Sequence, residues 1–241
     1  NMIPKIIHQI YFDFHNKKIE EIPLFNTSSK RIQEFNPDYE YKLWSEKECE
    51  DVVKENLPQH YDFYKSMKFK IQQIDYMRFV LLYVYGGIYI DLDLIPIRKL
   101  DSTLNQKFFS YSLRDLIPGH HEFVQNDFMG SIKNFKLWEI IFAACEINYH
   151  KKLAMEVYEV RKGRFVLHTT GPSFFSKILK KVLPNYNPQL YYVFTKWKNN
   201  NWKKVDRSKY LFENYVSTAW AHSVNKKLTI KDSFYLKEDE L

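Results

Sequence analysis

The sequence predicts an α/β protein, in which helices flank a sheet. Short apolar and β-branched runs, typical of strands, alternate along the chain with longer amphipathic stretches, typical of helices. The clearest helix covers residues 70–85 and leads through two glycines directly into an apolar strand. The 241 residues, of which 45% are hydrophobic, suffice for a sizeable core, and no composition change marks a boundary. We therefore expect a single domain over residues 1–241.

The N-terminal part carries start and stop signals for each expected element. Asn36 precedes Pro37 and so ends a helix, because the residue before proline avoids the helical conformation. Ser45 and Glu48 have the spacing of a capping box, which starts the next helix. An apolar run and an alternating run predict strands before these helices. The expected elements are a strand at 3–10, a helix at 26–36, a strand at 39–44, a helix at 45–56 and a short helix at 59–65.

The helix at residues 70–85 carries two charged residues on its apolar face. Asp75 and Arg78 are three residues apart, so their side chains can touch. They lie within the apolar stripe and not opposite it, and buried charges need partners and often mark a functional site. Gly86-Gly87 ends the helix, because glycine accepts the left-handed conformation that occurs there.

Two aspartates, Asp91 and Asp93, stand at the end of the strand that follows the glycines. The two-residue period of a strand would place both on the same side of an extended segment. Two carboxylates this close repel each other unless a cation lies nearby, and a divalent metal takes hard oxygen ligands. A metal held beside this glycine-rich turn would suit a diphosphate leaving group.

The second half of the chain continues with further strands and helices. Pro172 follows a hydroxyl-bearing loop and is well placed as the first residue of a helix, and helix N-termini bind anions. Residues 196–209 are polar and basic, and we expect them to form a loop. The other expected elements are strands at 95–97, 108–113, 127–132 and 191–195, loops at 115–124 and 168–173, and helices at 136–148, at 150–162 and from Pro172 to about 182.

The charge of the chain favours anionic partners. The formal net charge is +7, and basic residues crowd the C-terminal region from about 185 to 241. We expect this region either to be a solvated basic face or to contact the acceptor or a membrane surface. No nucleic-acid-binding motif accompanies the charge, so we expect no nucleic acid partner. The two cysteines lack metal-type spacing, and no apolar run has spanning length, so we expect a cytoplasmic protein that could lie at a membrane surface.

An ordered set of motifs resembles glycosyltransferase family 32. The core of the resemblance is Asp75-x-x-Arg78 followed by Tyr85-Gly86-Gly87-x-Tyr89-x-Asp91-x-Asp93, which is similar to the DXD-containing sugar-binding region of that family. The segments at 3–10, 37–44 and 170–172 and the late His222-x-x-Asn225-Lys226 also resemble family landmarks. Members include initiating α-mannosyltransferases, α-1,4-galactosyltransferases and bacterial polysaccharide enzymes.

The resemblance implies a GT-A fold, a Rossmann-like α/β domain that binds a nucleotide-sugar and Mn²⁺ or Mg²⁺. It implies that Asp93 and Asp91 bind the metal, with His222 as a further contact. It implies that Asp91 and Asp93, with Asp75 and Arg78, form the catalytic centre. The implied nucleotide-sugar site comprises Gln9, Ile10, Tyr11, Asp75, Arg78, Gly87, Tyr89, Asp91, Asn126, Asp127, Thr170 and Gly171.

The expected function is therefore metal-dependent transfer of a hexose from a UDP- or GDP-sugar to a glycan, a lipid-linked sugar or another hydroxyl acceptor, as in polysaccharide biosynthesis. The resemblance implies retention of the anomeric configuration. Two alternatives stay open at this point. Asp91 could be the nucleophile of a phosphatase similar to the haloacid dehalogenases, or the protein could bind carbohydrate without catalysis.

Overall fold

The computed structural model describes residues 2–13, 16–100, 105–112, 124–155, 162–189, 192–195, 206, 208 and 210–214. The strands are β1 (Ile6–Ile10), β2 (Glu40–Trp44), β3 (Gly87–Ile90), β4 (Leu94–Pro96), β5 (Phe108–Ser112), β6 (Val124–Ser131), β7 (Val193–Thr195) and β8 (Phe212–Asn214). The α-helices are α1 (Pro23–Phe35), α2 (Glu46–Asn56), α3 (Tyr61–Ser66), α4 (Lys70–Tyr85), α5 (Lys136–Ala154), α7 (Lys162–Thr169) and α8 (Pro172–Val182). Two short 3-10 helices cover Ile19–Glu21 and Pro58–His60.

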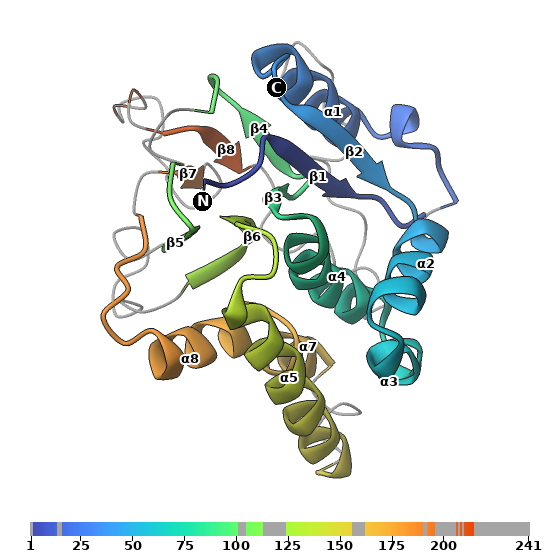
Figure 1. Cartoon of the computed structure of the whole chain (residues 1–241). Coiled ribbons are helices and arrows are strands. Elements are labelled where there is room, and N and C mark those ends of the chain that lie inside the picture. Colours follow the sequence, from blue (N-terminus) through green and yellow to red (C-terminus); the bar gives the residue numbers. More distant parts are fainter. Residues whose placement is uncertain are drawn as a thin grey trace.

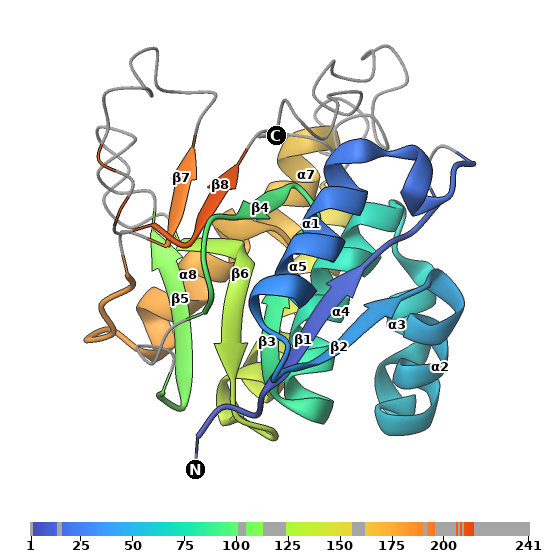
Figure 2. The ribbon, with the colours of Figure 1, turned by 90° about the horizontal axis from the view of Figure 1, so that it is seen from above.

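Five strands form a mixed main sheet in the order β2-β1-β3-β6-β5. Strand β1 pairs in parallel with β2 and β3, whereas β6 runs antiparallel to β3 and to β5. Figure 2 shows these strands side by side. Because β6 runs against β3, the carboxyl ends of β1 and β3 share one edge of the sheet with the start of β6. In open α/β sheets, ligands bind at the carboxyl ends of the strands.

Helices and a second sheet cover the two faces of the main sheet. Figure 1 shows α4, α5, α7 and α8 on one side, and α1 and the smaller sheet β4-β8-β7 on the other. Successive strand residues alternate between these layers, as the pleat requires. Tyr89 belongs to the core under the larger helical layer, whereas Ile88 and Ile90 belong to the core under α1 and the smaller sheet. The predicted α/β layering is therefore confirmed.

The turn between α4 and β3 requires two glycines. Gly86 has φ 68° and Gly87 has φ 103°, both in the left-handed region that other residues avoid. A Cβ on Gly87 would also lie 2.5 Å from the carbonyl oxygen of Ile6, so the two strands could not approach as they do. The glycines thus let helix α4 turn back immediately into a strand that pairs with β1.

His8 fastens β1 to this turn. Its Nδ1 accepts a hydrogen bond from the indole N–H of Trp44 at 3.1 Å, so the proton of the neutral ring is on Nε2, which donates to the carbonyl oxygen of Gly86 at 2.8 Å. The side chain is fully buried, and burial lowers the pKa of His8 to about 4. Protonation of Nδ1 would turn an acceptor into a donor that faces another donor.

The stability of the protein should therefore fall in acid through His8. Its pKa is lower in the folded state than its ordinary value of 6.5, so its contribution is complete above about pH 6.5 and is lost as the pH falls toward 4. The loss should approach about 3 kcal/mol at pH 4. Urea unfolding of the unaltered protein and of His8→Gln across this range measures it. The difference in unfolding free energy between the two should shrink as the pH falls, and a constant difference would contradict the assignment.

Several helices and strands begin or end at other residues than predicted. Helix α1 begins at Pro23 and not at Asn26, because proline occupies its first turn. Helix α5 continues to Ala154 and takes in the start of the helix expected at 150–162, since no glycine or proline interrupts it. His168 and Thr169, expected in a loop, end helix α7. Strand β6 begins at Val124, three residues before the expected start.

Other predicted features lie outside the residues that the structure describes. The loop at 115–123, the basic stretch around Trp197 and Trp202, and most of the region from 185 to 241 lie outside them, so their predicted roles stay predictions. Strand β8 lies in this region and was missed by the sequence analysis. Among the described helices, none combines the length and apolar character that a membrane crossing needs.

Candidate active site

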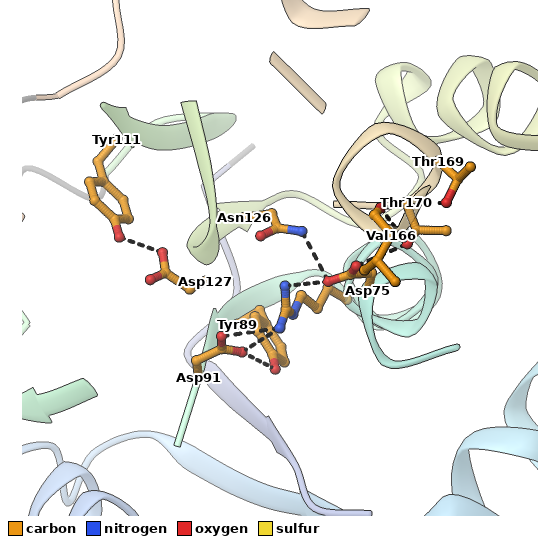
Figure 3. A network of polar contacts seen from close by, with 10 residues as sticks. Asp75, Tyr89, Asp91, Tyr111, Asn126, Asp127, Val166, Thr169 and Thr170 are labelled. Atoms are coloured by element: carbon orange, nitrogen blue, oxygen red, sulfur yellow. Dashed lines mark hydrogen bonds and ion pairs between the residues drawn. The ribbon is translucent and has the colours of Figure 1, made fainter. Parts of the chain in front are cut away.

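The candidate site lies where α4, β3, β5, β6 and the α7–α8 junction meet. Helix α4 runs back along the sheet before the glycine turn, so its second turn lies near the carboxyl end of β3. Asp75 comes from that turn and Arg78 from the next one, Asp91 follows β3, and Asn126 and Asp127 come from the start of β6. Figure 3 shows Asp75, Asn126 and Asp91 in one set of polar contacts, with the pair of Asp127 and Tyr111 beside it.

Asp75 is held on both carboxylate oxygens. Its Oδ1 accepts from Arg78 Nη1 at 2.7 Å and from Asn126 Nδ2 at 3.3 Å, and its Oδ2 accepts from the Thr170 hydroxyl at 2.9 Å. Burial raises the pKa of Asp75 to about 6, while the charge of Arg78 and the hydrogen bond from Thr170 oppose the rise. The predicted contact between Asp75 and Arg78 is confirmed, and Asn126 and Thr170 join it.

Arg78 bridges the helix and the DXD motif. Its Nη2 lies 2.9 Å from Asp91 Oδ1, so one guanidinium pairs with two carboxylates. The Tyr89 hydroxyl donates to Asp91 at 2.6 Å, and the Tyr89 ring lies beneath the guanidinium at 5.2 Å from its centroid. The Asp91 side chain is 20% exposed, whereas the Arg78 side chain is only 7% exposed. The network therefore fixes Asp91 while leaving part of it open to a ligand.

The DXD motif lies in a turn and not on a strand. Strand β3 ends at Ile90, and Asp91 to Asp93 form the turn before β4, so the expected strand-like arrangement of the two aspartates is wrong. The backbone N–H of Asp91 donates to the carbonyl oxygen of Asp127 at 2.8 Å and so continues the pairing with β6. Both aspartates therefore follow the carboxyl end of β3, at the edge of the sheet where β6 begins.

Asp93 has the features of an unused metal ligand. Its Oδ1 is screened from solvent and has no hydrogen-bond partner among the described residues. Burial, together with repulsion from Asp91 and Asp127, raises the pKa of Asp93 well above its usual range. A buried carboxylate oxygen without a partner is costly, and a divalent cation would satisfy it. Asp93 therefore fits a metal, with Asp91 beside it.

The described residues alone do not form a complete set of metal ligands. No group of three or more His, Cys, Asp or Glu side chains within them is arranged to hold a metal ion. Magnesium-type ions are commonly held by one or two carboxylates together with substrate phosphates. His222, the third predicted ligand, lies outside the described residues and stays a prediction.

Tyr111 is a member of the network that the sequence analysis missed. Its hydroxyl donates to Asp127 Oδ1 from the neighbouring strand β5, as Figure 3 shows. Burial, and then repulsion from Asp91, raises the pKa of Asp127 to about 7, and the Tyr111 hydrogen bond opposes the rise. The only sequence signal for Tyr111 is a tyrosine within an apolar strand, which indicates packing as readily as function.

Some predicted nucleotide-sugar residues lie elsewhere. Gly87 is at the opposite end of β3 from Asp91, where the lack of a side chain allows close packing against Ile6 and His8. Its predicted contact with the nucleotide-sugar stays a prediction. The Gln9 amide is buried and bonded to Ser28 and to Tyr41.

Three further predicted residues flank the site. Ile10 is buried at the carboxyl end of β1, and Tyr11 follows it, with its hydroxyl bonded to the carbonyl oxygen of Lys17. Gly171 caps helix α8 next to Thr170, and its N–H donates to the carbonyl oxygen of Val166 at 3.0 Å. Any contact that these residues make with a nucleotide stays a prediction.

The chain is similar to known glycosyltransferases. Residues 24–110 match the family model described as the glycosyltransferase sugar-binding region containing the DXD motif. A mannosyl phosphorylinositol ceramide synthase of Saccharomyces cerevisiae is 34% identical over 75% of this chain and 42% of the relative. An inositol phosphoceramide mannosyltransferase of Schizosaccharomyces pombe is 32% identical over 76% of this chain and 49% of the relative. The chain thus spans less than half the length of either relative.

Solved structures support the same fold. The PaToxG glycosyltransferase matches with a TM-score of 0.56 at 20% identity, over 76% of this chain and 70% of that protein. The UDP-bound glycosyltransferase domain of the YGT toxin matches with a TM-score of 0.51 at 10% identity, over 75% and 77%. The predicted GT-A fold is confirmed.

Proposed function

Because this chain belongs to glycosyltransferase family 32, we propose that it transfers a hexose from a nucleotide diphosphate sugar to a hydroxyl acceptor, with a divalent metal at the DXD turn. The observation that carries the proposal is the buried Oδ1 of Asp93, which has no hydrogen-bond partner among the described residues and lies beside the network of Asp75, Arg78 and Asp91. The family membership favours transfer over the phosphatase and over a non-catalytic carbohydrate-binding protein.

Asp93, with Asp91, would hold the metal together with the diphosphate of the donor. A bound Mn²⁺ or Mg²⁺ would supply Lewis-acid stabilisation of the negative charge that grows on the leaving diphosphate. Repulsion from Asp91 contributes to the raised pKa of Asp93 and of Asp127. A bound cation would relieve that repulsion and would offset the charge of a diphosphate at this edge of the sheet. This arrangement of carboxylates supports the proposal of a metal at the DXD turn.

Asp75 and Arg78 would position the donor sugar. Both side chains are buried and fixed by neighbours, so hydroxyl groups that reach them would meet preorganised partners. Within the described part of the chain, Asp75 Oδ2 accepts one hydrogen bond, from Thr170, and a carboxylate oxygen can accept a second. Retention of configuration is the outcome implied by the family, and front-face transfer would need no protein nucleophile.

The donor and acceptor follow from the relatives only as proposals. The two relatives are named for mannosyl transfer to inositol phosphoceramide, so mannose and a lipid-linked acceptor are the first candidates. A glycan acceptor and a role in polysaccharide biosynthesis remain part of the proposal. A single GT-A domain over residues 1–241 is likewise proposed.

Thermal-shift measurements with UDP, GDP and their hexose derivatives, with and without Mn²⁺, test the proposal. We expect stabilisation by one class of nucleotide that depends on Mn²⁺, because diphosphate and metal bind the same carboxylates. The stabilising donor should then be hydrolysed slowly and transferred to an added acceptor. Absence of any metal-dependent shift with every nucleotide would contradict the proposal.

Tyr111→Phe should lower the rate of transfer about tenfold, because Asp127 would lose a hydrogen bond to a charged group. The change removes one oxygen atom and leaves the ring packing intact. The matched control is Tyr64→Phe, which removes an equally buried hydroxyl that has no hydrogen-bond partner among the described residues. Initial rates of both variants, measured beside their unfolding free energies, separate the site effect from general stability. Equal transfer rates in the two variants would show that the Tyr111 hydroxyl does not contribute to the reaction.

A further inference from the structure

Helix α1 buries three hydroxyl-bearing residues in its interior, although serine and threonine are weak helix formers. Thr27, Ser28 and Ser29 are all buried, and the Ser28 side chain is fully shielded from solvent. Such residues favour caps and turns over helix interiors, because their hydroxyl groups compete for backbone hydrogen bonds. A buried hydroxyl also costs stability unless it has a partner. The partners of the Ser28 hydroxyl therefore indicate what it contributes.

The Ser28 hydroxyl donates a hydrogen bond to the backbone that directly follows the DXD motif. Its Oγ lies 2.7 Å from the carbonyl oxygen of Leu94, which is the residue after Asp93 and the first of β4. The N–H of Leu94 donates to the carbonyl oxygen of Asp91 at 3.3 Å, across the turn. Helix α1 packs against β4, and Figure 2 shows the two side by side. Ser28 thus ties the end of the DXD turn to α1.

The orientation of the Ser28 hydroxyl is fixed by a series of buried hydrogen bonds. The Leu94 carbonyl can only accept, so Ser28 donates its one proton there and accepts from Gln9 Nε2 at 3.1 Å. Gln9 Oε1 then accepts from the Tyr41 hydroxyl at 2.8 Å, and that hydroxyl accepts from Ser29 at 2.7 Å. Each of these groups has one orientation that satisfies both neighbours, so the series holds the Leu94 carbonyl in one place.

We propose that Ser28, oriented by Gln9 and Tyr41, is a positioning residue that holds the DXD turn so that the Asp93 carboxylate stays where a divalent metal binds. The inference rests on the proposed function and deepens it, because it names residues that act through Asp93 without contacting the metal. Among the described residues nothing bonds to the buried Oδ1 of Asp93, so the place of this oxygen depends on the backbone beside it. Groups that orient a metal ligand typically contribute about 10- to 100-fold to metal affinity.

Mn²⁺ binding by Ser28→Ala, made in the full chain, tests the inference. Electron paramagnetic resonance reports free Mn²⁺ without any turnover, in one series with saturating UDP and in another with saturating GDP. A titration without protein corrects for Mn²⁺ that the free nucleotide binds. We expect the apparent dissociation constant for Mn²⁺ to rise about tenfold, because the Leu94 carbonyl loses its donor and the turn gains freedom.

Tyr41→Phe is a second variant, which keeps the ring and removes one hydroxyl at the far end of the series. Without that donor the Gln9 amide can rotate and present its oxygen to Ser28, whose proton then no longer has to point to Leu94. The apparent dissociation constant for Mn²⁺ should rise about threefold. This variant decides the question if Ser28→Ala does not fold.

Ser131→Ala is the matched control. The Ser131 hydroxyl is fully buried, accepts from the Trp138 indole N–H at 2.7 Å and donates to the carbonyl oxygen of Ile132 at 3.1 Å. The control therefore removes the same number and kind of hydrogen bonds as Ser28→Ala. Ser131 pairs with Gly87, at the opposite end of β3 from the DXD turn, so its loss should leave the affinity for Mn²⁺ unchanged.

Weaker Mn²⁺ binding in Ser28→Ala beside unchanged binding in Ser131→Ala supports the inference. Unchanged binding in Ser28→Ala, or equal weakening in Ser131→Ala, would overturn it, and the same two outcomes apply to Tyr41→Phe where that variant decides. If the unaltered protein bound no Mn²⁺ with either nucleotide, the proposed function itself would fail. That result is seen in the unaltered protein, before any variant is compared, so the two failures are distinguishable.

Discussion

Asp93→Asn should lower the rate of sugar transfer by about 100- to 1,000-fold at saturating Mn²⁺. The reason is that an amide binds a divalent cation far less well than a carboxylate, and the Lewis-acid contribution to such reactions is several kcal/mol. The same variant should keep or raise the melting temperature of the metal-free protein. The substitution removes a carboxyl group that Asp91 and Asp127 repel when it is ionised. The Oδ1 of that group has no hydrogen-bond partner among the described residues.

Activity assays and thermal denaturation of the same preparation check both halves of this prediction. Asp62→Asn is the matched control, since Asp62 is an exposed aspartate of α3 outside the network. It should change neither quantity measurably. Full Mn²⁺-dependent activity in Asp93→Asn would exclude Asp93 as a metal ligand. A large fall in its melting temperature would show that Asp93 is needed for folding and not only for chemistry.

Arg78→Leu should lower the free energy of unfolding by about 3–5 kcal/mol. The substitution removes the guanidinium that pairs with Asp75 at 2.7 Å and with Asp91 at 2.9 Å. It leaves the buried carboxylate of Asp75 and the partly buried carboxylate of Asp91 without that countercharge. Arg78→Lys should be nearly as damaging, because a single ammonium cannot reproduce the forked contact with two carboxylates. Urea unfolding at neutral pH measures these changes.

Two further variants sharpen this prediction. Adding Asp75→Asn to Arg78→Leu should recover part of the lost stability, because one of the two unpaired charges is then gone. Lys5→Ala breaks an ion pair of similar length with Asp38 that is largely exposed, and it should change stability little. If Arg78→Leu were no more destabilising than Lys5→Ala, the network would not be a buried ion-pair system.

The sequence by itself determined the elements that carry the site. The apolar periodicity of residues 70–85 identified helix α4, and the glycines identified its end, because both are local properties of the chain. The position of Asp75 and Arg78 on that helix predicted their contact, which the structure confirms at 2.7 Å. The capping box of Ser45 and Glu48 is likewise confirmed.

Only the tertiary structure decided which residues meet. Tyr111 reaches Asp127 because β5 pairs with β6, and Thr170 reaches Asp75 because the α7–α8 junction packs against α4. Sequence spacing cannot predict such contacts, since Tyr111 and Asp127 are 16 residues apart and Asp75 and Thr170 are 95 residues apart. The tertiary structure also shows why Gly87 is a glycine. The motif predicted a contact with the ligand, whereas in the structure the absence of a side chain lets β1 approach β3. Local patterns fixed helices and turns, and packing between distant segments fixed the partners of each charged side chain.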